Sequence, residues 1–220
     1  MGTKMKLRSH IPDEQNVLAI HRDIDLLIAN CHPAPAPCIA ACPKTGERQC
    51  SPDCPDAAIA LASEPETAPL EATIAPLVYQ LKKLGVFEPF WSCEGHDGTD
   101  GYLWKTPKVW FYADSVIHVR VLAECIAELS VQHRLNHRWQ VTVTYCEPQN
   151  AGAAFSLPPC ATETLSLAPL RRDIRTITEA LPYLAEELAR VYTRHACRAL
   201  GRPARAAAAS HTGALVGDHG

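Results

Sequence analysis

The sequence lacks any run of apolar residues long enough to cross a membrane, and residues 1–16 contain no stretch that resembles a secretory signal. Its charges nearly balance, with 21 Lys and Arg against 24 Asp and Glu, so no general attraction to polyanions is built in. The motifs G-x-x-x-x-G-K, G-x-G-x-x-G and H-E-x-x-H are absent, which excludes the usual signatures of nucleotide cofactors and zincin proteases. We therefore expect a cytoplasmic protein with no membrane span.

Phenylalanine and methionine are scarce, at 4 and 2 residues, whereas proline, cysteine and histidine reach 18, 10 and 10 of the 220 residues. Cysteine and histidine are the commonest soft metal ligands, and in a reducing cytosol clustered cysteines favour metal ligation or reactive thiols over disulfides. Ligand chemistry is therefore the first function to look for.

Hydrophobic periodicity predicts one α+β domain over residues 1–200 and a disordered tail at 201–220. We expect an antiparallel or mixed sheet of three to five strands, with helices packed on one face and a Cys/Pro-rich N-terminal loop. The expected helices are 12–30, one ending at Gly85, one capped by Asp114 or Ser115, and 169–200; the expected strands are 87–93, 108–113, 138–146 and an edge strand at 155–157.

All four tryptophans and most other aromatic residues fall between 87 and 145, which predicts an aromatic sheet core within 87–157. In 169–200, apolar residues at alternating steps of three and four are typical of one helix packing on another. This pattern allows a homodimer through a helix pair, although docking on the sheet is commoner. Pro182 predicts a kink or two separate helices there.

The loop at 31–55 contains a repeated pattern, because Cys38-x3-Cys42-Pro is followed by Cys50-x3-Cys54-Pro. Two such thiolate pairs can hold one tetrahedral zinc ion, with Cys31 as a further ligand. A bound metal would also order a segment that has few apolar residues. Unpaired thiols or redox-labile disulfides are the alternative.

The second half of the repeat, from Cys50 to Ile59, resembles the end of a bacterial ferredoxin cluster motif, in which Cys-x3-Cys-Pro precedes Ala-Ile. The resemblance implies an iron-sulfur cluster in place of zinc. Lys44 and Glu47 stand where the family has two further cysteines, so Cys31, Cys38 or Cys42 would have to complete the ligand set.

A second candidate site is the turn from Ser92 to Gly101, which gathers a thiol, an imidazole, three carboxylates and three glycines. Cys93 and His96, with Glu94 between them, form our candidate catalytic set, because an imidazolium lowers the pKa of a neighbouring thiol. Alternatively, both ligate a metal with Asp97 or Asp100 as a third ligand. A further alternative is that the turn has no chemical function and only connects two strands of a hairpin.

Ser92-Cys93-x-Gly95 is also similar to the Ser-Cys-Ser-Gly-Arg signature of the wybutosine-synthesis family of tRNA-modifying methyltransferases. Glu94 and His96 replace the family's Ser and Arg, so the cation of that signature is missing and its RNA chemistry is not carried over.

The leading hypothesis is a small metal-binding protein whose N-terminal repeat holds zinc or, less favoured, an iron-sulfur cluster. The alternative is an enzyme that uses the Cys93–His96 turn as a thiol or metal site. A nucleic-acid-binding module using Arg190, Arg194 and Arg198 ranks last, because a solvated helix face explains that spacing as well.

Overall fold

A computed structural model describes residues 14–33, 70–144, 153–160 and 165–199. Outside the described residues lie most of the predicted Cys/Pro-rich loop, with Cys38, Cys42, Cys50 and Cys54, and the predicted tail at 201–220.

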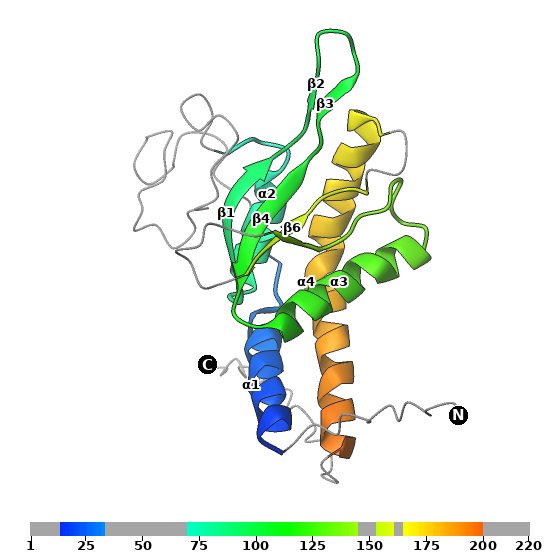
Figure 1. Ribbon diagram of the computed structural model, residues 1–220. Coiled ribbons are helices and arrows are strands. Elements are labelled where there is room, and N and C mark those ends of the chain that lie inside the picture. The colour runs from blue at the N-terminus through cyan, green and yellow to red at the C-terminus, as the bar shows by residue number, and fades with distance from the viewer. Residues whose placement is uncertain (1–13, 34–69, 145–152, 161–164, 200–220) are drawn as a thin grey trace, which may run out of the picture.

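Helices and strands are mixed along the described chain, which confirms the α+β class (Figure 1). The helices are α1 (Glu14–Asn30), α2 (Ala75–Lys83), α3 (Val116–Val131) and α4 (Leu167–Ala199). The strands are β1 (Phe87–Cys93), β2 (His96–Asp97), β3 (Leu103–Lys105), β4 (Lys108–Ala113), β5 (Thr142–Thr144) and β6 (Ala154–Leu157). Within the described segments, no helix combines the length and apolar character that a membrane span requires.

Four strands form one sheet in the order β1-β4-β6-β5, and every neighbouring pair is antiparallel, as expected. The prediction that residues 155–157 form an edge strand is wrong, because β6 lies between β4 and β5 and all its residues are buried. Within the expected strand at 138–146, the structure shows β5 and an isolated bridge between Trp139 and Pro159, and residues 145 and 146 lie outside the described part of the chain. Local alternation does not reveal how many neighbours a strand will have.

An irregularity in the pairing of β1 with β4 accompanies a cluster of aromatic side chains. The pairing register shifts between Pro89 and Trp91, so Phe90 is an extra residue of the kind found in a β-bulge. Phe90 stacks on Tyr112 at 4.7 Å between ring centroids, and Trp91 packs on Trp110 at 5.1 Å. Both aromatic residues therefore contribute to one half-buried aromatic cluster.

The hydrophobic core is mostly aliphatic and is built by all four helices against the sheet. Phe111 and Trp139 belong to this core, as expected of an aromatic sheet. The expectation is wrong for Tyr102 and Trp104, which are 77% and 66% exposed on the β2–β3 hairpin. This hairpin projects from the main sheet (Figure 1), and Leu103, between the two aromatic residues, is its side chain that packs against the core.

Helix α2 begins only at Ala75, after Glu71 and Thr73. Pro76 lies in the first turn, where its missing N–H costs no hydrogen bond, and the chain leaves the helix at Gly85 with a positive φ of 69°. The late start leaves Glu71 and Thr73 outside the helix. Their polar groups are therefore available to the end of β1.

Helix α4 is continuous through Pro182, so of the two predicted alternatives, a kink or two separate helices, the second is wrong. Proline removes one helical hydrogen bond, but α4 packs along α1, α2 and α3, and this tertiary packing outweighs the local loss. The seam of Leu170, Ile174 and Ile177 is buried within this same chain.

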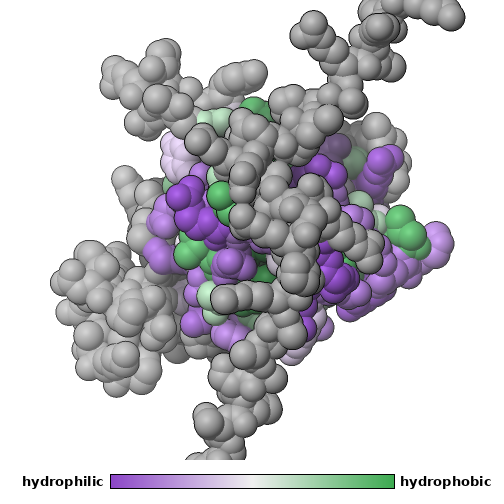
Figure 2. Space-filling model, turned by 90° about the horizontal axis from the view of Figure 1, so that it is seen from below, coloured by the Kyte–Doolittle hydropathy of each residue, from purple (hydrophilic) through white to green (hydrophobic). Residues whose placement is uncertain are grey.

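Seen from below, the described residues in view are mostly hydrophilic, with apolar residues in small groups (Figure 2).

Candidate metal centre

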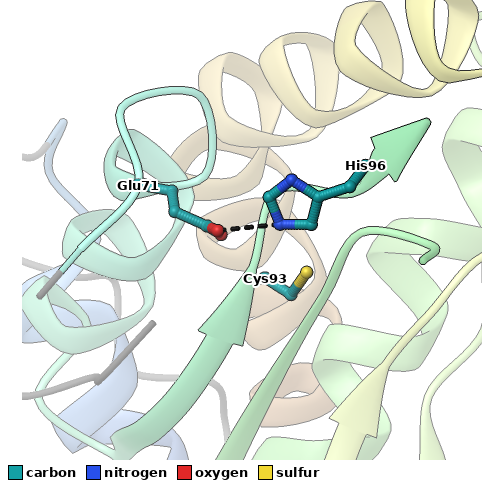
Figure 3. Close-up of side chains that lie close together, drawn as sticks. All are labelled: Glu71, Cys93 and His96. Carbon is teal, nitrogen blue, oxygen red and sulfur yellow. Dashed lines mark ion pairs between the residues drawn. The ribbon is translucent and has the colours of Figure 1, made fainter. Parts of the chain in front are cut away.

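Three side chains from separate segments meet at one end of the sheet. Glu71 precedes α2, Cys93 is the last residue of β1, and His96 is the first residue of β2. One ligand atom from each lies within 4.8 Å of the other two (Figure 3). We call these three residues the Glu-Cys-His cluster.

The turn between β1 and β2 brings Cys93 and His96 together. Gly95 has a φ of +84°, a backbone conformation that residues with a side chain rarely adopt. A Cβ at this position would also lie 2.8 Å from side-chain atoms of Leu167 and Pro107. The glycine is therefore required by both conformation and space, and it turns the chain sharply enough to place His96 beside Cys93.

Glu71 clamps this turn from the other side. One carboxylate oxygen, Oε1, lies 2.9 Å from Nε2 of His96, and the other, Oε2, accepts a 2.6 Å hydrogen bond from the backbone N–H of Glu94. The Glu71 side chain is 11% exposed and that of His96 is 34% exposed. The carboxylate is thus largely shielded, whereas the imidazole reaches solvent.

The orientation of the imidazole distinguishes two kinds of chemistry. In Figure 3 Nε2 of His96 points to the Glu71 carboxylate, the Cys93 sulfur lies below the imidazole ring, and Nδ1 points away from both. A nucleophile–base–carboxylate relay needs one ring nitrogen toward the thiol and the other toward the carboxylate. Here the nitrogen that is not bound to Glu71 points away from the thiol, so this relay is not formed, whereas one ligand atom of each residue lies within 4.8 Å of the other two.

Cys93 is fully buried, yet it does not belong to the hydrophobic core that joins the helices to the sheet. Sulfur, imidazole nitrogen and carboxylate oxygen are all ligands of zinc, at bond lengths of about 2.0 to 2.3 Å. Tetrahedral ligand atoms are then roughly 3 to 4 Å apart. A cluster within 4.8 Å needs only a small contraction to reach this geometry.

Glu94, the third candidate catalytic residue, points elsewhere. Its Oε1 accepts a 3.0 Å hydrogen bond from Arg171 Nη2, and its Oε2 accepts one of 2.9 Å from the backbone N–H of Thr73. Of the three residues, the structure therefore brings Cys93 and His96 together, and Glu94 ties their turn to α4 and to the segment before α2.

The expected third ligands, Asp97 and Asp100, are exposed and do not belong to the cluster. Asp100 instead accepts a hydrogen bond from the backbone of Tyr102. Glu71 takes the place that we expected for them, and no sequence signal identified it. It is remote from the Cys93–His96 turn in the chain and lies in the segment before α2.

Cys31, a predicted ligand of the N-terminal metal, lies just after α1 in the hydrophobic core and is 5% exposed. Burial, with a smaller effect from the Glu186 carboxylate, raises the pKa of its thiol to about 12. Burial likewise raises the pKa of the neighbouring Cys125 thiol. Metal ligation requires a thiolate, which this apolar environment disfavours.

Of the three arginines that a nucleic-acid-binding module would use, one is ion-paired on its own helix. Arg190 Nη2 donates a 2.5 Å hydrogen bond to Glu186 one helical turn earlier, whereas Arg194 is exposed. The side chain of Arg198 lies outside the described residues.

No protein-family model matches this chain, and no curated protein or solved structure matches it either. Its function is therefore inferred from the geometry of its own residues.

Proposed function

We propose that the protein binds a zinc ion through Glu71, Cys93 and His96. The convergence of three different ligand atoms within 4.8 Å carries this proposal. Sulfur and imidazole ligands favour zinc over magnesium or calcium, which take mainly oxygen ligands. The site is distinct from the N-terminal Cys-x3-Cys-Pro repeat, for which a zinc or iron-sulfur site stays a prediction.

Three protein ligands leave one position of a tetrahedral ion for water or substrate, as in catalytic zinc sites. His96 is the most exposed of the three and marks the side from which a ligand would enter. We therefore infer a metal-dependent enzyme in which zinc activates a water molecule or polarises a substrate oxygen. A thiol enzyme is less well supported, because Nε2 of His96 already contacts Glu71.

Contacts within the protein orient one of the proposed ligands. Glu71 bonds to both His96 and the turn backbone, so its carboxylate is oriented before an ion arrives. Metal ligation by a thiolate and a neutral imidazole releases protons. Metal affinity should therefore rise with pH.

Cobalt titration tests the proposal, because Co²⁺ occupies zinc sites and its visible bands report tetrahedral thiolate ligation. The test uses a chain in which Cys38, Cys42, Cys50 and Cys54 are changed to serine, so that their thiols cannot contribute. In this background we expect one tight cobalt site that zinc displaces. Cys93→Ser and His96→Ala should each weaken cobalt binding at least about tenfold.

Matched controls are Cys160→Ser, which removes another buried thiol, and His195→Ala, which removes an exposed imidazole. Both should leave cobalt binding unchanged, and circular dichroism should show that every variant folds. Equal affinity in Cys93→Ser and Cys160→Ser would contradict the proposed site.

A further inference from the structure

A groove with a volume of about 450 Å³ lies between the start of α2 and the N-terminal part of α4. Thr73 and Pro76 line it from the α2 side, and Arg171, Arg175 and Thr178 line it from α4. Its size lies within the range of pockets that hold small organic ligands.

The lining of the groove contains two cationic side chains and one anionic side chain, and one of the cations, Arg171, is paired with Glu94. Two guanidinium groups, Arg171 and Arg175, line it together with one carboxylate, Glu179. Arg171 uses Nη2 to hold Glu94, but its Nε makes no hydrogen bond to any described residue. Arg175 is exposed and takes part in none of the ion pairs found in the described segments.

Short hydrogen bonds connect this groove to the Glu-Cys-His cluster. Arg171 donates to Glu94, and the backbone N–H of Glu94 donates to Glu71, a member of the cluster. Thr73 lines the groove and also donates its backbone N–H to Glu94. One turn thus forms part of the metal centre and is held by two residues of the groove wall.

We propose that the groove binds the anionic group of a small-molecule substrate, a phosphate or a carboxylate, and presents the rest of that molecule to the metal centre. The proposal rests on the proposed function for its link to the metal, but anion binding itself does not require the metal. Guanidinium groups bind such oxyanions through paired N–H donors, and the hydroxyl of Thr73 can add a hydrogen bond. Ile174 and Pro76 supply an apolar wall for a carbon skeleton.

Calorimetric titration of the metal-free full chain with methyl phosphate and, separately, acetate tests this binding and distinguishes the two anions. At least one anion should bind saturably. Arg175→Gln should weaken its binding about tenfold, because a charge-assisted hydrogen bond is lost. Arg175 is exposed, so this change should leave the fold intact.

The matched control is Arg172→Gln, which removes an exposed charge from the same helix but outside the groove lining. It should change anion affinity by less than about twofold, as expected for a screened surface charge. The inference is overturned if neither anion binds saturably, or if the two arginine variants weaken binding equally.

Cobalt-loaded protein then tests the link to the metal. The bound anion should shift the visible cobalt bands, and Arg175→Gln should raise the anion concentration needed for this shift. Cobalt binding that depends on Cys93, with no anion binding, would overturn the groove alone. Anion binding that depends on Arg175, with cobalt binding indifferent to Cys93, would overturn the metal centre and leave an anion site without it.

Discussion

Cys31 and Cys93 are both buried thiols, but their neighbours give them different chemistry. Cys31 lies among apolar side chains of the core, where a thiolate is unfavourable. Cys93 lies beside an imidazole and a carboxylate at the end of a strand. Burial alone therefore does not distinguish a packing cysteine from a ligand, and the identity of the nearest polar groups does.

At the residue scale, we expect Cys31→Ala to leave the zinc content of the purified protein unchanged. The variant should lose about 1 kcal/mol of unfolding free energy at pH 7, because a small buried side chain is removed. Elemental analysis and denaturant unfolding measure the two effects. Loss of metal from Cys31→Ala would instead support Cys31 as a ligand of the N-terminal repeat.

The same variant has a defined pH dependence. Folding raises the pKa of the Cys31 thiol from 9.0 to about 12, so the folded state favours the protonated thiol. This contribution to stability is fully present below pH 9.0 and is lost as the pH rises toward about 12. The difference in unfolding free energy between wild type and Cys31→Ala should therefore shrink over that range.

Helix α4 organises the molecule at the scale of elements, because it positions both the groove and the chain after α3. Its buried Asp173 accepts four hydrogen bonds from the segment that leads to Trp139. The donors are the backbone and side-chain nitrogens of Asn136, the backbone N–H of His137 and the indole N–H of Trp139. The Asp173 carboxylate thus provides hydrogen-bond acceptors for three residues of the segment after α3.

We expect Asp173→Asn to reduce the unfolding free energy by about 3 kcal/mol, since an amide cannot accept on both of its polar atoms and leaves buried donors unpaired. Denaturant unfolding measures this loss. Glu179→Gln, an exposed change on the same helix, is the control and should alter stability by less than about 0.5 kcal/mol. Equal losses in the two variants would mean that Asp173 does not hold the connection.

At the scale of the whole molecule, α4 extends from the region of the β2–β3 hairpin to the end where it packs on α1 (Figure 1). The Glu-Cys-His cluster depends on the packing of α2 against β1 and α4, because Glu71 precedes α2 and Cys93 ends β1. The cluster is therefore a product of the assembled fold.

This arrangement predicts how much zinc the chain holds. We expect wild-type protein to bind more than one zinc ion if the N-terminal repeat also forms a site, and the chain with serine at 38, 42, 50 and 54 to retain about one. Elemental analysis after gel filtration measures both values. A serine variant without zinc would leave the repeat as the metal site and contradict the Glu-Cys-His cluster.

Local patterns determined the elements that depend on near neighbours in the chain. The sequence predicted β1 and β4 with the bounds that the structure shows, and Ser115 caps α3 by accepting a hydrogen bond from Ile117, as expected. It also predicted that Cys93 and His96 meet. Strand alternation, helix capping and a glycine turn each involve residues only a few positions apart.

Only the tertiary structure decided which remote groups join these elements. Glu71 enters the cluster through the late start of α2 and its packing, and Cys31 enters the core instead of facing polar partners. β6 lies inside the sheet because strands on both sides pair with it. These contacts form between segments that are far apart in the chain. Their free energy therefore depends on both segments, and the hydrophobic periodicity of one segment does not indicate which other segment it will contact.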